Sequence, residues 1–575
     1  MRKVSAVAFG LALTLLLVGK AYPVDMDYVM VRDLNEDRMM KYFGKIPGSK
    51  LMAEDLAEMT SDTFEGDTLR LLAVLVEWTD RPGTYSRESF ESFFFSRNEY
   101  PGGSVADYFH EVSYGKVAVT GDVVDWVNAG YYDNSFLFST LFDQLDLIVD
   151  FSLYDGDGNK KVDAVCFVRS GNGEEDSGDP NDIWSFAAMT TSGWGPYDNV
   201  RVNTYNTSPE TRPLRDSLDP TKFTGESVQN RIRVFCHELS HNLGLPDLYD
   251  YDRKLDHTTY YTDGDWNDHP LVDWCLMGYY GYGHLGIGSD VPSHLCGWSK
   301  MQLDWITPVT VAEDFVGVIT LNSIETQTEN SLYALPIDDV QGEYFLLEYR
   351  NPSSMAMFDK LDSDFSCYFW PNLAYGCDPL DRGLLITHIH DSVTAEDTWF
   401  GLNNGTPSYP HYTVSVEDAG YNPSRPASSN PEGHVTDSAQ WWYPYETRKG
   451  ALFSSDVPGQ KEFGPLTTPN SDGYNGSSGI YVRVESMDSE QIQVFVNMNT
   501  QEYCCINRGD INHDHNLSGL DLLYFINYLW GDGPAPECAV EADVDGNGEI
   551  EPIDLIFLVH FFWNDGQAPP VCSQS

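Results

Sequence analysis

Two histidines and a glutamate between residues 234 and 250 have the spacing of a metal-binding helix. His237 and His241 are four positions apart, so a helix places both imidazoles on one face, where they can share one Zn²⁺ ion. Glu238 follows the first histidine and can reach a water on that ion without binding the metal. Zinc lowers the pKa of such a water to about 7, and Glu238 would accept its proton during attack on a peptide carbonyl. The pattern predicts zinc-dependent hydrolysis of peptide bonds.

The residues that follow this helix are candidates for the remaining parts of the site. Gly244 can adopt the left-handed conformation that ends a helix, after which the chain turns at Pro246. This turn can bring Asp247 back toward the histidines, so we expect Asp247 to be the third zinc ligand. A more distant carboxylate is the alternative. Farther along, Met277 in the run Trp-Cys-Leu-Met-Gly is a candidate for the methionine that metzincin-type proteases place beneath the zinc.

A second group of oxygen-bearing side chains alternates along a glycine-containing loop. Asp155, Asp157 and Asn159 occupy every other position, and Asp163 follows them. Alternate oxygens on a tight loop can converge on a hard cation such as Ca²⁺. We therefore expect a calcium site here, with an acidic turn before a strand as the alternative interpretation.

The C-terminal region contains the same loop pattern twice. Each copy is a twelve-residue loop with oxygen-bearing side chains at its first, third, fifth, ninth and twelfth positions, followed by an apolar helix. These side chains are Asp510, Asn512, Asp514, Ser518 and Asp521 in the first loop, and Asp543, Asp545, Asn547, Glu551 and Asp554 in the second. This spacing wraps one Ca²⁺ ion per loop, although a standard EF-hand ends its loop with Glu and has a helix on both sides.

The elements that must position these residues change in character along the chain. A buried strand is expected from residue 69 to 78, a helix from 104 to 114 and another strand from 162 to 168. From 309 to 499 short alternating strands are separated by Pro, Gly, Ser and Asn, which predicts an all-β, sandwich-like region. The expected fold is therefore multidomain, with an α/β (α+β) domain, an all-β region and a small α-helical module with calcium loops.

Two parts of the sequence resemble known protein families. Residues 68 to 500 resemble the immune inhibitor A family of secreted bacterial zinc metallopeptidases, which are metzincin-like. The runs that carry this resemblance are 103–116, 154–163, 237–250, 274–278, 292–305, 383–391 and 469–471. The resemblance implies a zincin catalytic domain with His237 and His241 as zinc ligands and Glu238 as general base.

The duplicated C-terminal loops resemble a dockerin, a calcium-binding module that attaches to a cohesin partner. The resemblance covers residues 505 to 572, although His515 replaces the usual glycine at the sixth position of the first loop. It implies about two calcium ions in this module. The expected organisation is a signal peptide at 1–21, a pro-segment or N-terminal arm at 22–67, a catalytic domain at 68–308, a β-rich domain at 309–500 and a dockerin-like module at 501–575.

Composition and the N-terminus indicate an exported protein. The 575 residues include 34 Lys and Arg against 88 Asp and Glu, a net charge of −54, so we do not expect nucleic acid or anionic lipid as partners. Arg2 and Lys3 precede an apolar run that is too short to span a membrane, and small residues precede a cut after Ala21. We expect a secreted or surface-attached protein with no membrane span in its mature chain.

The ten cysteines suggest disulfides in such a compartment. Cys367 and Cys377 are close enough in sequence to pair. Four more cysteines could cross-link the C-terminal module, namely Cys504, Cys505, Cys538 and Cys572.

Two other functions stay open at this stage. One is a non-catalytic adhesion or scaffold protein that carries a dockerin and keeps a protease-like fold. The other is a carbohydrate-active enzyme, which would use a pair of catalytic carboxylates and need no zinc. The expected substrate of the peptidase is a protein or peptide.

Overall fold

The computed structural model describes most of the chain from residue 67 onward, together with one short strand near the N-terminus. The described residues are 29–31, 67–215, 223–248, 271, 274–278, 292–338, 342–351, 358, 382–391, 413–417, 419, 452–456, 460–465, 467, 469–473, 476–498, 508–512, 517–531, 533–536, 538–547, 549–563 and 568–570. The predicted signal peptide lies outside these residues, and so does the predicted N-terminal arm apart from its short strand and residue 67. The contacts divide the chain into two units.

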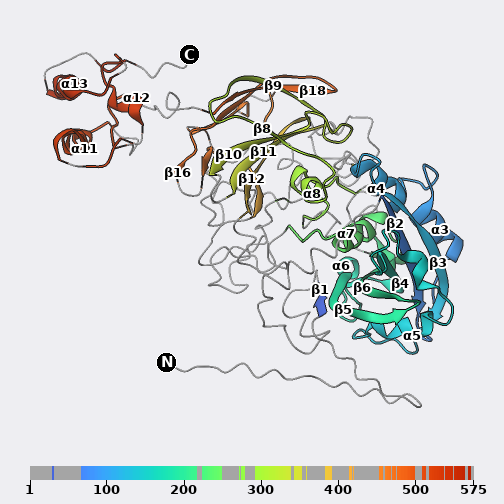
Figure 1. Ribbon diagram of the computed structural model, residues 1–575. Helices are drawn as coiled ribbons and strands as arrows, with labels where there is room; N and C mark the ends of the chain where they lie inside the picture. The colour runs from blue at the N-terminus through green and yellow to red at the C-terminus, as the bar shows by residue number, and fades with distance from the viewer. Residues whose placement is uncertain are drawn as a thin grey trace, which may run out of the picture. The chain divides into compact units, whose positions relative to one another are not determined.

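The first unit contains a seven-stranded sheet with the strand order β1-β5-β6-β4-β2-β3, and β7 pairs with β6 (Figure 1). Its strands are β1 (Val29–Val31), β2 (Thr68–Glu77), β3 (Ala118–Asn128), β4 (Ala164–Asn172), β5 (Phe186–Tyr197), β6 (Val200–Arg215) and β7 (Phe223–Gln229). The four strands β3, β2, β4 and β6 run parallel, whereas β1, β5 and β7 pair antiparallel to their neighbours. The strands predicted at 69–78 and 162–168 are thus confirmed as β2 and β4.

Parallel strands explain the continuous apolar run in β2, because such a sheet is covered on both faces. Leu72, Val74 and Val76 pack into one hydrophobic cluster with Phe142 and Phe151. These two aromatic residues belong to short helical segments, which are η1 (Phe138–Leu141), α5 (Phe142–Leu145) and η2 (Phe151–Tyr154).

The longer helices of this unit are α3 (Arg87–Phe95), α4 (Val105–Val112) and α7 (Ile232–Asn242), and α6 (Glu174–Ser177) is a single turn. The helix predicted at 104–114 is α4, and it begins at a capping box. The Ser104 hydroxyl accepts the amide of Asp107, whose carboxylate accepts the amide of Ser104. The predicted end at residue 114 is late, because Ser113 already leaves the helical conformation as the C-cap.

The β-rich part of the second unit consists of two main sheets. One has the order β13-β12-β11-β10-β8, the other has the order β14-β17-β18-β9, and β15 and β16 form a separate pair. The strands are β8 (Val309–Thr310), β9 (Val316–Asn322), β10 (Leu332–Asp338), β11 (Glu343–Arg350), β12 (Gly383–His390), β13 (Val414–Val416), β14 (Glu462–Phe463), β15 (Asp472–Gly473), β16 (Gly476–Ser477), β17 (Tyr481–Met487) and β18 (Gln491–Asn497). Helix α8 (Gly297–Gln302) precedes them.

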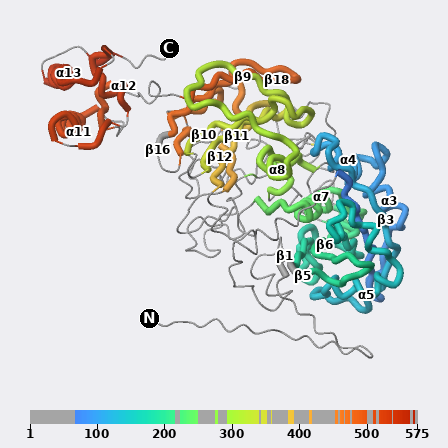
Figure 2. Tube along the Cα trace, in the orientation of Figure 1, coloured from blue at the N-terminus to red at the C-terminus, as the bar shows by residue number. Residues whose placement is uncertain are grey.

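One hydrophobic core joins the two main sheets. It contains Leu321 and Val494 from the four-stranded sheet and Phe345 and Ile386 from the five-stranded sheet. Figure 2 shows β9 and β18 running side by side, and they pair antiparallel along their whole length. Alternating strands with a shared core agree with the sandwich-like region that the sequence predicts.

The C-terminal module contains α11 (Gly519–Trp530), the single turn α12 (Ala539–Ala542) and α13 (Pro552–Trp563). Its small core includes Ile511, Phe525, Val544 and Leu558. Cys538 is disulfide-bonded, which supports the predicted cross-linking of this module. Cys367, Cys377, Cys504, Cys505 and Cys572 lie outside the described residues.

The four remaining cysteines are buried thiols, which differs from the general expectation that the cysteines pair. They are Cys166, Cys236, Cys275 and Cys296. No helix among the described residues is both long and apolar enough to cross a membrane.

Candidate metal centres

Helix α7, which carries the predicted zinc ligands, is buried along its entire length. Phe235 packs edge-on against Phe93 of α3, with 4.9 Å between the ring centroids. At the other end of the helix, the side-chain amide of Asn206 in β6 donates to the side-chain oxygen of Asn242 over 3.0 Å. These contacts fix the helix between α3 and the sheet, so its polar side chains are held inside the protein.

The two histidines of α7 lie one turn apart, as their spacing predicts. Their ring centroids are 4.9 Å apart, and both side chains of His237 and His241 are fully buried. Glu238 is also buried. Two imidazoles and a carboxylate inside a protein are costly unless they bind a metal or have polar partners.

The tautomer of His241 suits metal binding. Its Nδ1 lies 2.7 Å from the carbonyl oxygen of Leu245. Because a carbonyl oxygen can only accept, Nδ1 carries the proton and Nε2 of the neutral ring keeps its lone pair. Gly244 allows Leu245 to make this contact. Its φ of +94° lies in the left-handed region, so the helix ends as predicted and the chain turns back.

Asp247 completes a cluster with the histidines. One ligand atom from each of His237, His241 and Asp247 lies within 4.8 Å of the others, and all three residues are buried. Two imidazole nitrogens and one carboxylate oxygen are ligand types of catalytic zinc sites, which keep a further position for water or substrate. The amide of Leu248, the next residue, donates to the carbonyl of the buried Met277 over 2.9 Å. The donor set and its burial therefore fit a zinc ion.

The loop before β4 brings together the carboxylates that the sequence predicts as calcium ligands. One oxygen from each of Asp155, Asp157 and Asp163 lies within 4.8 Å of the others. The Asn159 side-chain oxygen accepts the amide of Lys161 over 2.7 Å, and the Asn159 amide donates to the Asp157 carboxylate over 3.0 Å. These short-range bonds shape the loop so that its acidic groups converge.

The pKa of Asp163 is raised to about 7 in this loop. Burial is the main cause, and the neighbouring carboxylates of Asp157 and Asp155 add to it. The amides of Arg70 and Gly156 donate to this carboxylate and oppose the shift. A divalent cation would remove the repulsion, because it supplies the largest local charge in such a site.

The second C-terminal loop has a similar arrangement. One carboxylate oxygen from each of Asp543, Asp545 and Asp554 lies within 4.8 Å of the others. The amides of Asp545 and Glu551 donate to the two oxygens of Asp554 over 3.1 and 2.9 Å. The Asn547 side-chain amide donates to Glu551 over 3.2 Å. All five predicted ligands of this loop therefore lie around the start of α13.

The first loop repeats these bonds at equivalent positions. The amides of Asn512 and Ser518 donate to the two oxygens of Asp521 over 3.3 and 2.7 Å. Asp510 and Asp521 are both fully buried, and burial followed by the nearby Asp510 charge raises the pKa of Asp521. Asp514 lies outside the described residues. The twofold repetition in sequence is therefore also a repetition in structure.

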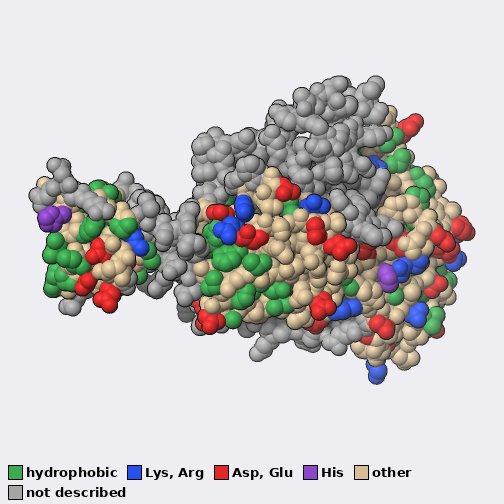
Figure 3. All heavy atoms as spheres, turned by 90° about the horizontal axis from the view of Figure 1, so that it is seen from above, with side chains coloured by type: hydrophobic (Ala, Val, Ile, Leu, Met, Phe, Trp, Pro, Cys, Tyr) green, Lys and Arg blue, Asp and Glu red, His purple; other side chains and the backbone are tan. Residues whose placement is uncertain are grey.

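The sequence did not single out one feature of this module, an exposed apolar stripe on each long helix. Side chains at matching positions of α11 and α13 are 37% to 66% exposed. They are Leu520, Leu523, Ile526 and Trp530 on α11, and Ile553, Ile556, Val559 and Trp563 on α13. Figure 3 shows apolar side chains on the surface of this module. A spacing of about three residues in both helices was the signal that could have identified the stripe.

Comparison with known proteins assigns the C-terminal module. Residues 508–562 match the family model of the dockerin type I domain. No curated protein matches the chain. Dockerins bind calcium and imply a cohesin partner, and proteins that carry them are typically extracellular or attached to the cell surface. The predicted dockerin and its calcium ions are thereby supported.

Proposed function

We propose that this protein is a zinc-dependent endopeptidase with Glu238 as its general base, and that the dockerin attaches it to a cohesin-bearing scaffold or surface. The single observation that carries the proposal is the buried cluster of His237, His241 and Asp247, with Glu238 on the same helix. The resemblance of residues 68 to 500 to secreted zinc metallopeptidases supports the same reaction.

Different residues of the chain would bind the metal and transfer the proton. His237, His241 and Asp247 would hold the ion, and the Leu245 carbonyl keeps the His241 ring in the tautomer that binds metal. When bound, zinc acidifies water to a pKa of about 7 and polarises carbonyl groups. Glu238 accepts the proton of the attacking water and returns it to the amine that leaves, which is general acid–base catalysis.

The same chemistry explains why a buried carboxylate is useful beside the histidines. A general base works best when it is held within hydrogen-bond reach of the proton that it removes. Glu238 is on a helix that is packed on all sides, so its backbone cannot drift from the two histidines. The chain is therefore built to fix the relative positions of base and ligands.

The test is hydrolysis of casein by the purified full-length protein in excess calcium, with and without 1,10-phenanthroline. We expect activity that the chelator abolishes and that added zinc restores. Calcium in excess keeps the calcium loops filled, so the loss reports on zinc alone. A protein that binds no zinc and cleaves nothing, also after limited proteolysis of its N-terminal segment, would support the non-catalytic scaffold alternative.

A further inference from the structure

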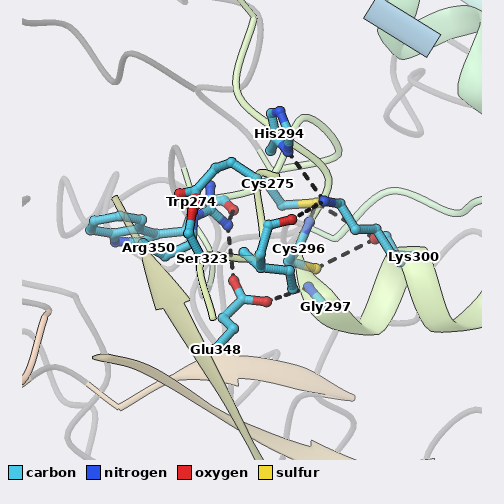
Figure 4. Close-up of polar contacts among 12 residues, drawn as sticks. Trp274, Cys275, His294, Cys296, Gly297, Lys300, Ser323, Glu348 and Arg350 are labelled. Carbon is cyan, nitrogen blue, oxygen red and sulfur yellow. Dashed lines mark hydrogen bonds and ion pairs between the residues drawn. The ribbon is translucent and has the colours of Figure 1, made fainter. Parts of the chain in front are cut away.

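Two of the four buried thiols, those of Cys275 and Cys296, lie in one cluster of polar contacts (Figure 4). Cys275 and Cys296 are 21 positions apart in sequence, and the Cys296 amide donates to the Cys275 sulfur over 3.3 Å. Both sulfurs lie within 3.5 Å of one hydroxyl oxygen, that of Ser299. The Cys296 thiol also hydrogen-bonds the Cys275 sulfur.

The backbone around both cysteines is held in place by neighbouring bonds. The Leu276 amide donates to the carbonyl of His294 over 3.1 Å, which joins the segment around Cys275 to the segment before Cys296. From β11, Arg350 donates to the carbonyl of Trp274 over 3.1 Å, and Glu348 accepts the Gly297 amide over 2.5 Å. Arg350 and Glu348 are themselves paired at 2.9 Å. Hydrogen bonds of the segments around both cysteines therefore hold the two thiols close together.

We propose that Cys275 and Cys296 form a disulfide in the mature protein. The dockerin indicates a protein that works outside the cell, where adjacent thiols are oxidised. The disulfide at Cys538 belongs to the same kind of environment. Cys166 and Cys236, by contrast, lie singly on β4 and α7 and stay thiols.

The oxidation is a thiol–disulfide exchange with an oxidised disulfide oxidoreductase of the export compartment. One thiolate attacks the oxidant's disulfide and forms a mixed disulfide, and the second thiolate then displaces the oxidant as a thiolate. The pair loses two electrons and two protons in total, and the oxidant leaves as a dithiol.

The two thiols differ in acidity in the folded chain. Burial raises the pKa of the Cys275 thiol, but hydrogen bonds from Cys296 and Ser299 outweigh it and lower the pKa to about 7. Burial raises the pKa of Cys296 well above its usual range. The difference follows from the contact between them, since the Cys296 thiol donates and the Cys275 sulfur accepts the hydrogen bond that joins them.

Burial also sets the time at which the bond forms. Cys275 and Cys296 are at most 1% exposed, so a protein oxidant cannot reach them in the folded chain. The bond must close during folding, before Cys275 and Cys296 are buried. Once formed, it ties the residues before Met277 to the N-cap of α8, and the closed loop stabilises the fold because it lowers the conformational entropy of the unfolded chain.

The test is peptide mapping of the exported full-length protein after denaturation and alkylation without reductant. We expect Cys275 and Cys296 in one linked pair of peptides that lacks two hydrogen atoms, with Cys166 and Cys236 fully alkylated as internal controls. Reductant added before alkylation should release both linked cysteines. Complete alkylation of Cys275 and Cys296 without reductant would overturn the proposal.

A variant distinguishes a structural pair from an accidental one. Cys275→Ser should leave Cys296 alkylated without reductant and should lower the thermal midpoint of unfolding, whereas Cys166→Ser should leave the linked pair intact. An unchanged midpoint in Cys275→Ser, with no linked peptides in the wild type, would contradict the proposal. These measurements do not use hydrolysis, so they can fail or succeed independently of the zinc peptidase.

Discussion

Asp247 has the most specific role among the single residues, because it is the one proposed zinc ligand that is not on α7. Its buried carboxylate lies with the two imidazoles in one cluster. If it binds the ion directly, its loss should cost more than the 10–100-fold in affinity that an outer-shell partner costs.

We therefore expect Asp247→Asn to lower zinc affinity by at least about 100-fold, because an amide oxygen is a neutral and weaker ligand than a carboxylate. Competition against a chromophoric zinc chelator measures this change. The control is Asp125→Asn, at an exposed position of β3. An unchanged affinity in Asp247→Asn would assign the third ligand to a more distant carboxylate.

A second prediction at this scale concerns His388 in the core of the β-rich sheets. Its Nε2 lies 2.9 Å from Glu343 and its Nδ1 lies 3.4 Å from Glu417. Burial lowers the pKa of His388, but the bonds to these carboxylates outweigh it and raise the pKa to about 9. An unfolded histidine titrates near 6.5, so protonation of His388 stabilises the fold fully below about pH 6.5.

This stabilisation should be lost as the pH rises from about 6.5 through 9, because the folded chain then gives up the proton that holds the two carboxylates. Calorimetric midpoints measured across this range should fall for the wild type and fall less for His388→Gln. Parallel profiles for the two proteins would show that His388 is not the group responsible.

At the scale of elements, calcium binding by the C-terminal loop–helix units was the property that the sequence predicted most completely. The ligand spacing of the C-terminal loops follows the chain directly, so their arrangement could be predicted residue by residue. The cluster at α7 was predictable only in part. The helical spacing places His237 and His241, but the Leu245 carbonyl that orients His241 is a backbone group with no signature in residue types.

The loop of Asp155, Asp157 and Asp163 should make the stability of the protein depend on pH, and calcium binding should change that dependence. Without calcium, the raised pKa of Asp163 means that the folded chain loses stability as the pH rises from about 4 to 7, because the unfolded carboxyl ionises more readily. A cation at about 100 times its Kd would stabilise the fold by about 2.7 kcal/mol.

We therefore expect the calcium-dependent rise in thermal midpoint to be larger at pH 7.5 than at pH 5, and to shrink in Asp163→Asn. The C-terminal loops contribute in the same direction, since the pKa values of Asp521 and Asp554 are also raised. The difference between wild type and Asp163→Asn measures the contribution of Asp163 to the calcium-dependent rise in thermal midpoint. A calcium response that is identical in variant and wild type would argue for an acidic turn without a cation.

The exposed stripes on α11 and α13 belong to the same scale, and they are the surface on which we expect a cohesin to bind. Leu523→Asp and Ile556→Asp introduce charges at matching positions of the two stripes. Each should weaken cohesin binding, and the double variant should weaken it by at least about 30-fold, the effect of losing a binding hot spot of about 2 kcal/mol.

Calorimetric titration with a purified cohesin measures this effect, and the calcium-bound fold should keep its thermal midpoint because the stripes are exposed. Leu153→Asp is a matched control, since Leu153 is 63% exposed in the first unit. Undiminished affinity in the double variant would place the cohesin elsewhere on the module.

At the scale of the whole molecule, the sequence predicted the succession of a mixed α/β part, a β-rich part and a repeated calcium-loop module. Short local patterns were sufficient for this, as β18 shows, because its alternation from Gln491 to Asn497 agrees with the strand in the structure. Contacts between distant residues could not be predicted. Nothing in the spacing of Cys275 and Cys296 indicates that their thiols meet.

The central claim, a zinc peptidase with Glu238 as base, is tested most directly by Glu238→Gln with zinc content and peptide hydrolysis measured on the same sample. The control is Glu226→Gln, at an exposed position of β7. We predict one zinc per chain in all three proteins, full activity in the control and a kcat lower by about 10²–10⁴ in Glu238→Gln. A zinc-loaded Glu238→Gln that cleaves as fast as the wild type, or a zinc-loaded wild type that cleaves no protein substrate, would contradict the account.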